Sequence, residues 1–343
     1  MILETILANI QDVAARAKVS IATVSRVLNE SNHKVRPQTR ARVLAAVRKL
    51  NYRPNALARG LLMKRTMTIG VIIPDISNPY YAEIVRGIQD VADETGYNIL
   101  LQNTDRKQER IIKSIHLLRE KIVDGVIFSG GIIHKFATLS ALNELRERVV
   151  VIGRHEVNFP AALVDNIGGA TAAIQHLIDL GHRKIAFIGG PKNSTTMIDR
   201  RKGYECALAQ NGYALKNNLL KWGNLSPESG YSAATALLRQ KNRPTAIFAC
   251  NDMMAFGSLH AARMLGLTVP DDVAVVGFDD VPLCAFIQPA LTTVAIPRYG
   301  LGVGATQMLI DLISGGAFER IRWFKTQLIT RESTAKQAHK PSS

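Results

Sequence analysis

The stretch VSIATVSRVLNE, residues 19–30, has apolar residues at helical spacing and an unusual outer face. The side chains between the apolar positions are short or hydrogen-bonding, and only Arg26 is charged before Glu30. Side chains of this kind can approach base edges closely, bond phosphates through hydroxyl groups, and place one guanidinium on a guanine. The stretch therefore predicts a DNA-contacting helix over Ile21–Leu28. Its candidate contacts are Ser20, Ile21, Ala22, Thr23, Ser25, Arg26 and Asn29.

The neighbouring residues predict two more helices that hold this one in place. An apolar stripe at Ile10, Val13, Ala14 and Ala17 predicts a short first helix, and AKVS forms a turn that ends in Ser20 as N-cap. Two short helices joined in this way have the proportions of a helix-turn-helix. A third helix is expected over 38–50. Its predicted inward residues are Val43, Leu44, Val47 and Leu50, and its predicted outward residues are Arg40, Arg42, Arg48 and Lys49.

The charge is concentrated in the same part of the chain. Residues 1–66 contain 13 Lys and Arg against 3 acidic residues, a net charge of +10, whereas the other 277 residues contain 30 against 25. A small basic module with no long run of like charge favours a nucleic acid as partner. Taken alone, residues 21–28 could also form an amphipathic helix with no special function. For the basic module as a whole, binding to a membrane surface is a weaker alternative to nucleic-acid binding.

Other features limit the class of protein. No apolar run reaches 18 residues, the start MILETILANIQD has no basic region followed by an apolar one, and the three cysteines form no spacing motif. We therefore expect a cytoplasmic protein with no membrane association. The cysteines are Cys206, Cys250 and Cys284.

From residue 69 the chain alternates short apolar runs with amphipathic segments. This order predicts an α/β fold with parallel strands covered on both faces. The runs are IGVIIP, NILLQN, GVIFSG, VVVIG, KIAFIGG, TAIFAC and VAVVGF. The pattern TIGVII followed by ETGYNI is repeated later in the chain as KIAFIG followed by QNGYAL. The separation is 27 residues in both cases, from Ile69 to Gly96 and from Ile185 to Gly212. Two similar halves predict two lobes with a cleft between them.

Ligands of open parallel sheets bind beyond the carboxyl ends of the strands. The residues there include aromatic rings, guanidinium groups and carboxylates, which suit a small hydroxylated metabolite. The candidate effector-binding residues are Tyr80, Tyr81, Arg154, Ser194, Thr196, Arg200, Asn251 and Asp279, with Asn78 nearby. Packing is the alternative role for the two tyrosines. Asp252 is expected to cap the helix that begins near Met253, and Asp280 to be a turn residue.

Three segments resemble catalytic or cofactor motifs only in part. IGGPKNST lacks the Gly-Lys-Ser/Thr ending of a phosphate loop, GLGVGAT lacks the dinucleotide spacing, and RHEV lacks a second histidine. No nucleophile with its base can be assembled on the strand ends. We therefore expect no cofactor, no metal and no enzyme activity.

The segments IQDVAARAKVSIATVSRVLN, NYRPNALARGL and TIGVIIPDISNPYYAEIVRGI resemble the lactose/galactose repressor family of bacterial transcription regulators. The resemblance runs from about Ile10 to Ser333. It implies a helix-turn-helix domain and hinge helix joined to a two-lobed, periplasmic-binding-protein-like core of parallel sheets. It also implies a hinge helix that enters the minor groove and inserts Leu61 between base pairs. The further DNA contacts are Tyr52, Asn55 and Arg59, and the matched effector positions are Arg200, Asn251 and Asp279, with Tyr81 and Thr196 in pocket loops.

The resemblance also divides the chain. We expect a DNA-binding domain at 9–54, a hinge and linker at 55–66, a core at 67–334 and a disordered tail at 335–343. Within the core, the first lobe is expected at about 67–164 and 294–323, and the second at about 165–293 and 324–334. The chain would cross between the lobes near Asp165, Thr293 and Trp323. The tail carries no leucine heptads, so a homodimer is expected.

The sequence departs from the family pattern at two places. Gly153 and Arg154 stand where members that bind neutral sugars often have a carboxylate, and Leu225 replaces a common aromatic. Arg154 beside Arg200 favours an anionic effector, such as a sugar acid or sugar phosphate. The expected function is a sequence-specific repressor of carbohydrate or sugar-acid genes on a pseudo-palindromic operator. The alternatives are an activator or partner-controlled regulator, and a cytoplasmic sugar-binding protein or sugar-converting enzyme.

Overall fold

The computed structural model describes residues 8–28, 35–52, 65–130, 136–145, 148–155 and 158–334. The chain divides into two compact units, Met1–Thr66 and Met67–Ser343. The predicted residues Asn29, Asn55, Arg59 and Leu61, most of the hinge segment, and the tail at 335–343 lie outside the described part of the chain.

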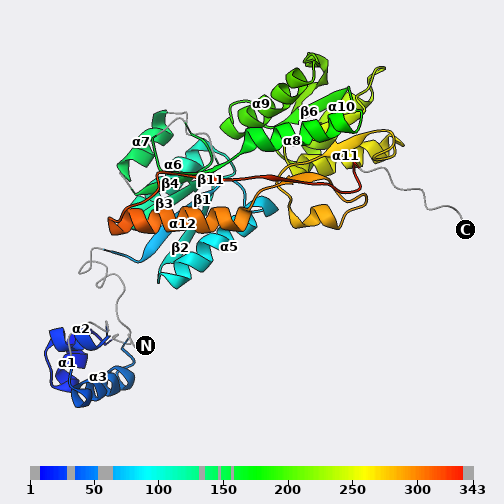
Figure 1. The fold of residues 1–343 in the computed structure, drawn as a ribbon. Coiled ribbons are helices and arrows are strands. Elements are labelled where there is room, and N and C mark those ends of the chain that lie inside the picture. The colour runs from blue at the N-terminus through cyan, green and yellow to red at the C-terminus, as the bar shows by residue number, and fades with distance from the viewer. Residues whose placement is uncertain are drawn as a thin grey trace, which may run out of the picture. The chain divides into compact units, whose positions relative to one another are not determined.

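The described part of the first unit is helical (Figure 1). It contains α1 (Ile10–Ala17), α2 (Ile21–Leu28) and α3 (Pro37–Lys49). Val13, Val24 and Val43 are fully buried or nearly so and form the centre of one small apolar core. The inward position predicted for Leu44 is wrong, because its side chain is 38% exposed and Ala46 is buried instead. Ala46, three residues after Val43, continues the inward face of α3, whereas Leu44 lies beside that face.

The first lobe of the second unit is built on a six-stranded parallel sheet in the order β11-β5-β4-β3-β1-β2. Helices α5 and α12 pack against each other on one face, and α6 and α7 pack together on the other (Figure 1). The strands are β1 (Thr68–Ile73), β2 (Asn98–Asn103), β3 (Gly125–Ser129), β4 (Val149–Ile152), β5 (Ala161–Val164) and β11 (Ile321–Phe324). The helices are α5 (Pro79–Glu94), α6 (Gln108–Glu120), α7 (Phe136–Glu144) and α12 (Arg298–Ser314).

The second lobe is built on a four-stranded parallel sheet in the order β7-β6-β8-β9. A short antiparallel pair, β10 with β12, packs beside α8. The strands are β6 (Ile185–Gly189), β7 (Leu220–Trp222), β8 (Ala246–Ala249), β9 (Ala274–Val276), β10 (Thr293–Ala295) and β12 (Gln327–Ile329). The helices are α8 (Asn166–Asp179), α9 (Thr195–Gln210), α10 (Pro227–Leu238) and α11 (Asp252–Met264), with short 3-10 turns η1 (Asn217–Leu219) and η2 (Pro282–Ala285).

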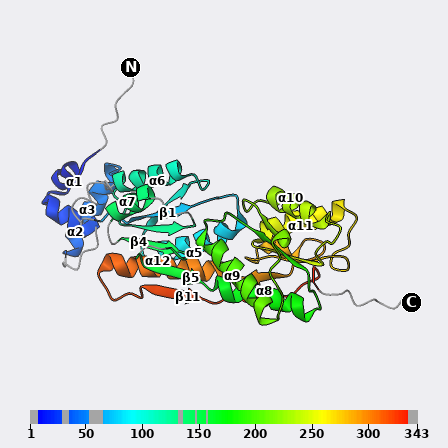
Figure 2. The same cartoon turned by 90° about the horizontal axis from the view of Figure 1, so that it is seen from above.

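The predicted α/β class with parallel sheets and a helix-turn-helix region is confirmed. All seven apolar runs form strands, and every residue of β3 and β4 is buried, as expected for strands covered on both faces. The chain passes between the lobes after β5, between β10 and α12, and between β11 and β12, so α12 lies with the first lobe although it follows the second (Figure 2). Asp165, Thr293 and Trp323 lie in or beside these passages.

The glycine cluster GLGVGAT serves helix packing. A Cβ atom at Gly302 of α12 would lie 2.1 Å from the carbonyl oxygen of Ile84 on α5. In the same way, a Cβ atom at Gly87 of α5 would lie 2.3 Å from the carbonyl oxygen of Tyr299. The two helix backbones therefore touch, and only glycine permits this approach.

Candidate functional site

The face of α2 that was predicted to contact DNA is open to solvent in its own unit. Ile21 is 45% exposed, and Ser20, Ala22 and Arg26 are also exposed. Thr23 and Ser25 are half-buried at the edge of this face. An isoleucine left exposed at the start of a helix has no role in the core of this unit, and it suits contact with a thymine methyl group.

Hydrogen bonds at the helix ends fix the presentation of this face. The Ser20 hydroxyl accepts a hydrogen bond from the backbone N–H of Thr23 at 3.2 Å, which confirms its predicted capping role. Asn9 and Asp12 form a capping box at α1, with bonds of 2.9 and 3.1 Å. Lys18 ends α1 in the left-handed conformation, with φ of 50°. Tyr52 packs partly against the small apolar core, so its position is explained by packing as well as by a DNA contact.

The second unit contains a cavity between its two lobes, of about 120 Å³. Seven of the eight predicted effector-binding residues line it, and Arg154 does not. The first-lobe wall consists of Pro74, Asn78, Tyr80, Tyr81, Arg106, Ser129, Gly130, Ile152, Gly153 and Val164. The second-lobe wall consists of Asn166, Pro191, Ser194, Thr196, Met197, Arg200, Leu225, Asn251 and Asp279.

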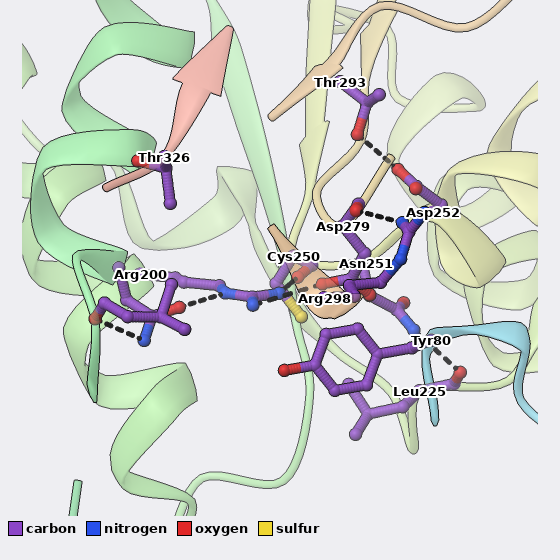
Figure 3. A network of polar contacts seen from close by, with 12 residues as sticks. Tyr80, Arg200, Leu225, Cys250, Asn251, Asp252, Asp279, Thr293, Arg298 and Thr326 are labelled. Carbon is purple, nitrogen blue, oxygen red and sulfur yellow. Dashed lines mark hydrogen bonds and ion pairs between the residues drawn. The ribbon is translucent and has the colours of Figure 1, made fainter. Parts of the chain in front are cut away.

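Arg200 and Asp279 form the buried polar centre of the cavity (Figure 3). Their nearest side-chain atoms are 3.2 Å apart, and both side chains are less than a tenth exposed. Every nitrogen of the guanidinium has a partner, because Arg200 also donates to the Asn166 side chain at 2.9 Å and to the Cys250 carbonyl oxygen. The guanidinium lies 3.6 Å from the ring centre of Phe278. This arginine is therefore held rigidly with its charge balanced by Asp279.

Asp279 is held in an unusual backbone conformation. Its φ is +121°, its carbonyl oxygen accepts a hydrogen bond from Arg298, and its N–H donates to the Val294 carbonyl oxygen at 2.8 Å. Left-handed backbone in a residue other than glycine is costly and clusters at ligand sites. Burial raises the pKa of the Asp279 carboxyl to about 7, although Arg200 acts to lower it.

The two tyrosines form the aromatic part of the first-lobe wall. Their rings meet edge to face, with centres 4.9 Å apart, and Tyr80 lies beside the polar centre in Figure 3. Burial raises the pKa of Tyr81 to about 12, so its hydroxyl stays protonated and can donate. Tyr80 also has a raised pKa, chiefly through burial. Both side chains are exposed to the cavity as well as packed, so the two predicted roles are compatible.

Arg154 makes a different contact from the one predicted. Its guanidinium forms a forked ion pair with Asp199, with bonds of 2.7 and 2.9 Å, and its carbonyl oxygen accepts a hydrogen bond from Thr195. Arg154 follows β4 of the first lobe, whereas Asp199 and Thr195 belong to α9 of the second. The contact therefore bridges the lobes beside the cavity.

Asn251, and not Asp252, caps α11. The Asn251 side chain accepts from the Met254 N–H at 3.1 Å and donates to the Leu225 carbonyl oxygen at 3.2 Å. The capping role predicted for Asp252 is wrong, because this side chain is fully buried and accepts from the Val281 N–H and the Thr293 hydroxyl at 2.9 and 2.5 Å. Figure 3 shows it linked to Thr293, and it is not among the residues that line the cavity.

Sequence reasoning missed Arg106 and Asn166 as cavity residues. Arg106 follows β2, so the same strand-end rule that identified Tyr80 could have identified it. Asn166 is the first residue of α8, and only its bond to Arg200 reveals its place. Among the described residues, no group of His, Cys, Asp and Glu could hold a metal ion, and no helix is long and apolar enough to cross a membrane.

Family models match both units of the chain. Residues 9–55 match the model of bacterial regulatory proteins of the lacI family, and residues 66–336 match that of periplasmic binding proteins and the sugar-binding domain of the LacI family.

Relatives extend the match over nearly the whole chain. Catabolite control protein A of Priestia megaterium is 41% identical over 88% of this chain and 91% of its own. The ribose operon repressor of Halalkalibacterium halodurans is 38% identical over 95% of this chain and 96% of its own.

Solved structures of similar proteins support the same family assignment. The Lac repressor dimer bound to operator and the anti-inducer ONPF has a TM-score of 0.86 and 29% identity, covering 96% of this chain and 99% of that one. The CelR–cellobiose complex has a TM-score of 0.73 and 32% identity, covering 95% and 99%. Members of the family are DNA-binding transcription regulators, so the alternative of a sugar-converting enzyme is wrong. The chain belongs to the LacI family of bacterial regulatory proteins.

Proposed function

We propose that this regulator represses transcription in the cytoplasm by binding a pseudo-palindromic operator as a homodimer. The observation behind this proposal is the exposed face of α2. On that face Ile21 offers an apolar contact to base edges, Ala22 allows close approach, and Arg26 provides a forked donor. The similar ribose operon repressor and the operator-bound Lac repressor dimer support repression and dimeric binding. A dimer with two-fold symmetry requires an operator with matching symmetry.

The chain divides by role in this proposal. Residues 9–54 bind the major groove, the segment 55–66 acts as hinge and enters the minor groove, and 67–334 form the core that binds effector and dimerises. The proposed DNA contacts are Ser20, Ile21, Ala22, Thr23, Ser25, Arg26, Asn29, Tyr52, Asn55, Arg59 and Leu61.

The effector is a small hydroxylated metabolite in the cavity between the lobes. The cavity has a volume of about 120 Å³, and its walls offer aromatic rings, hydroxyl groups and the Arg200–Asp279 pair to such a ligand. The similar structure of a regulator with cellobiose, and another with bound ribose, support a sugar-like class. Its proposed contacts are Tyr80, Tyr81, Ser194, Thr196, Arg200, Asn251 and Asp279. Arg154 is left out of this set because its guanidinium is bound to Asp199.

Effector binding would change the operator affinity by favouring one arrangement of the two lobes. The chain crosses between the lobes three times, and the cavity walls come from both, so a ligand there contacts both lobes together. Allosteric coupling of this kind amounts to about 1–3 kcal/mol.

In vitro selection with the full chain and a random duplex library tests the DNA-binding proposal. Selected sites should be pseudo-palindromic, and Ala22→Glu should abolish binding because a carboxylate would meet base edges or phosphates. Ala45→Glu adds the same charge on the exposed side of α3 and serves as the control. Selection of asymmetric sites, or equal loss in both variants, would contradict the proposal.

A further inference from the structure

Two arginines line the interlobe cavity, and they differ in how fully their donors are used. Arg200 on the second-lobe wall is 4% exposed and has a partner for each of its three nitrogens. Arg106 on the first-lobe wall is 29% exposed, and its nearest carboxylate oxygen, on Asp75, is 3.7 Å away. That distance is longer than a hydrogen bond, so the Arg106–Asp75 contact is a weak ion pair.

Asp75 is also bonded within its own loop, through the carboxylate oxygen that is not the one nearest to Arg106. One of its carboxylate oxygens accepts from the Ser77 N–H at 3.0 Å and from the Ser77 hydroxyl at 2.6 Å. Arg106 has five N–H donors in a fork, and beyond this ion pair its charge acts to lower the pKa of the Tyr81 hydroxyl on the same wall. Arg106 therefore has more donors left for a ligand than Arg200, because each of the three Arg200 nitrogens already has a protein partner.

The backbone at the end of β2 places Arg106 at the cavity. Asp105 and Arg106 both have left-handed φ values, 49° and 58°. The Asp105 side chain holds this turn, because it accepts from the Asn103 amide at 2.7 Å and pairs with Arg110. Two consecutive residues of this conformation are costly without glycine, and the fold maintains them where they direct Arg106 to the cavity wall.

The charge of the lining residues is unbalanced on the same side. The described lining has two guanidinium groups, on Arg106 and Arg200, and one carboxylate, on Asp279, which pairs with Arg200. The nearest counter-charge of Arg106, on Asp75, is 3.7 Å away and lies outside the lining, so the cavity wall itself presents the Arg106 guanidinium without a carboxylate beside it. On the same wall, a Cβ atom at Gly130 would lie 2.7 Å from the Tyr81 hydroxyl oxygen, so a larger residue there would displace Tyr81.

We propose that the effector carries an anionic group, a carboxylate or a phosphate, and that Arg106 binds it on the first-lobe wall. This inference rests on the proposed function, because it names the class of the effector in the same cavity. The hydroxylated part of the ligand would lie toward Asn251 and the Arg200–Asp279 pair. A guanidinium matches a two-oxygen anion better than an ammonium group does, so arginine and lysine are not equivalent here.

Calorimetric titration of the full chain with matched probes tests this inference. The probes are D-glucose, D-gluconate and D-glucose 6-phosphate, and D-ribose with D-ribose 5-phosphate. We expect at least one anion to bind about 10-fold or more tightly than its neutral counterpart, as one charge-assisted contact allows. The gluconate and phosphate arms distinguish the two kinds of anion.

Variants assign the preference to Arg106. Arg106→Gln should remove the anion preference while neutral sugars bind as before, and Arg106→Lys should restore only part of it. Arg86→Gln removes the same charge from an exposed site on α5 and should change nothing. A preference that survives Arg106→Gln, or binding of neutral sugars alone, would overturn the inference and leave the proposed function intact. Failure of every probe to bind would also overturn the inference, whereas operator binding, the basis of the proposed function, is tested separately by the selection experiment.

Discussion

The ion pair between Arg154 and Asp199 should hold the two lobes together, and breaking it should let them separate. The pair joins the loop after β4 to α9, through two hydrogen bonds of 2.7 and 2.9 Å. Asp199→Asn keeps the shape of the side chain, removes the charge and leaves one acceptor oxygen. The variant therefore tests the contact without opening a cavity.

The size of the effect follows from the exposure of the pair. Arg154 is 43% exposed and Asp199 13%, so solvent screens much of the attraction. An exposed pair contributes about 0.2–1 kcal/mol and bonds to charged groups about 1.5–3 kcal/mol, so we expect a value between them, about 1–2 kcal/mol. A loss of that size shifts the ratio of joined to separated lobes by about 5- to 30-fold.

Electron–electron distance measurements would detect this shift. Spin labels at Ser77→Cys and Asn193→Cys report from exposed positions on the two lobes, with Cys206→Ser as background. Cys250 and Cys284 are fully buried, and burial raises the pKa of Cys250 to about 12, so neither should react with the label. Mixing with excess unlabelled chain keeps the measured distances within one chain.

Asp199→Asn should lengthen and broaden the distance distribution, and Arg154→Asp with Asp199→Arg should restore it in part. The control is Arg201→Gln, because Arg201 pairs with Glu205 on the same helix, at similar exposure, without bridging the lobes. A distribution that is the same in wild type and Asp199→Asn would refute the role given to this pair.

Three further predictions concern the fold and the polar centre. Gly302→Ala should lower the melting temperature strongly in calorimetry, because its Cβ atom would lie 2.1 Å from the Ile84 carbonyl oxygen and the α5–α12 contact would have to open; an unchanged melting temperature would show that the helices separate easily. Ser20→Ala should destabilise the first unit by about 1 kcal/mol through loss of a helix cap, measured by urea unfolding of the full chain followed by a signal from that unit; no change would mean that the cap contributes nothing. Because the pKa of Asp279 is raised to about 7, the folded chain binds a proton there that the unfolded chain releases near pH 4, so its contribution to stability should fall as pH rises from 4 to 7 and level off above 7. Asp279→Asn should remove that part of the pH dependence, and identical pH profiles of the two proteins would contradict the raised pKa.

The sequence predicted most of the fold because its strands are unusually uniform. Strands such as β3 and β4 are buried along their whole length, so their apolar runs stand out. Strands β5, β7, β10 and β12 were missed; each has only three or four residues and does not stand within a longer β-branched run, as the short β9 does in VAVVGF. Strand β11 was missed because it lies at the sheet edge, where Ile321 and Trp323 stay exposed between half-buried neighbours.

The site was predictable to the extent that strand ends determine it. Residues directly after buried strands, such as Tyr80 and Asn251, line the cavity as that rule predicts. Arg154 also follows a strand, but its partner Asp199 is 45 residues away on another lobe, and a sequence pattern does not pair side chains across lobes. Asp252 shows the same limit, since its burial among Val281 and Thr293 depends on how β10 returns past α11.

The central claim is that a ligand in the interlobe cavity changes the affinity of the first unit for its operator. Fluorescence anisotropy at fixed salt would measure this directly, with the full chain, a duplex obtained by selection, and the sugar or sugar-acid probe that binds most tightly. The account predicts a change in operator affinity of about 5- to 150-fold on saturation of the cavity, and no change in Arg200→Gln, which disrupts the polar centre. An operator affinity that is the same with and without a saturating cavity ligand would contradict it.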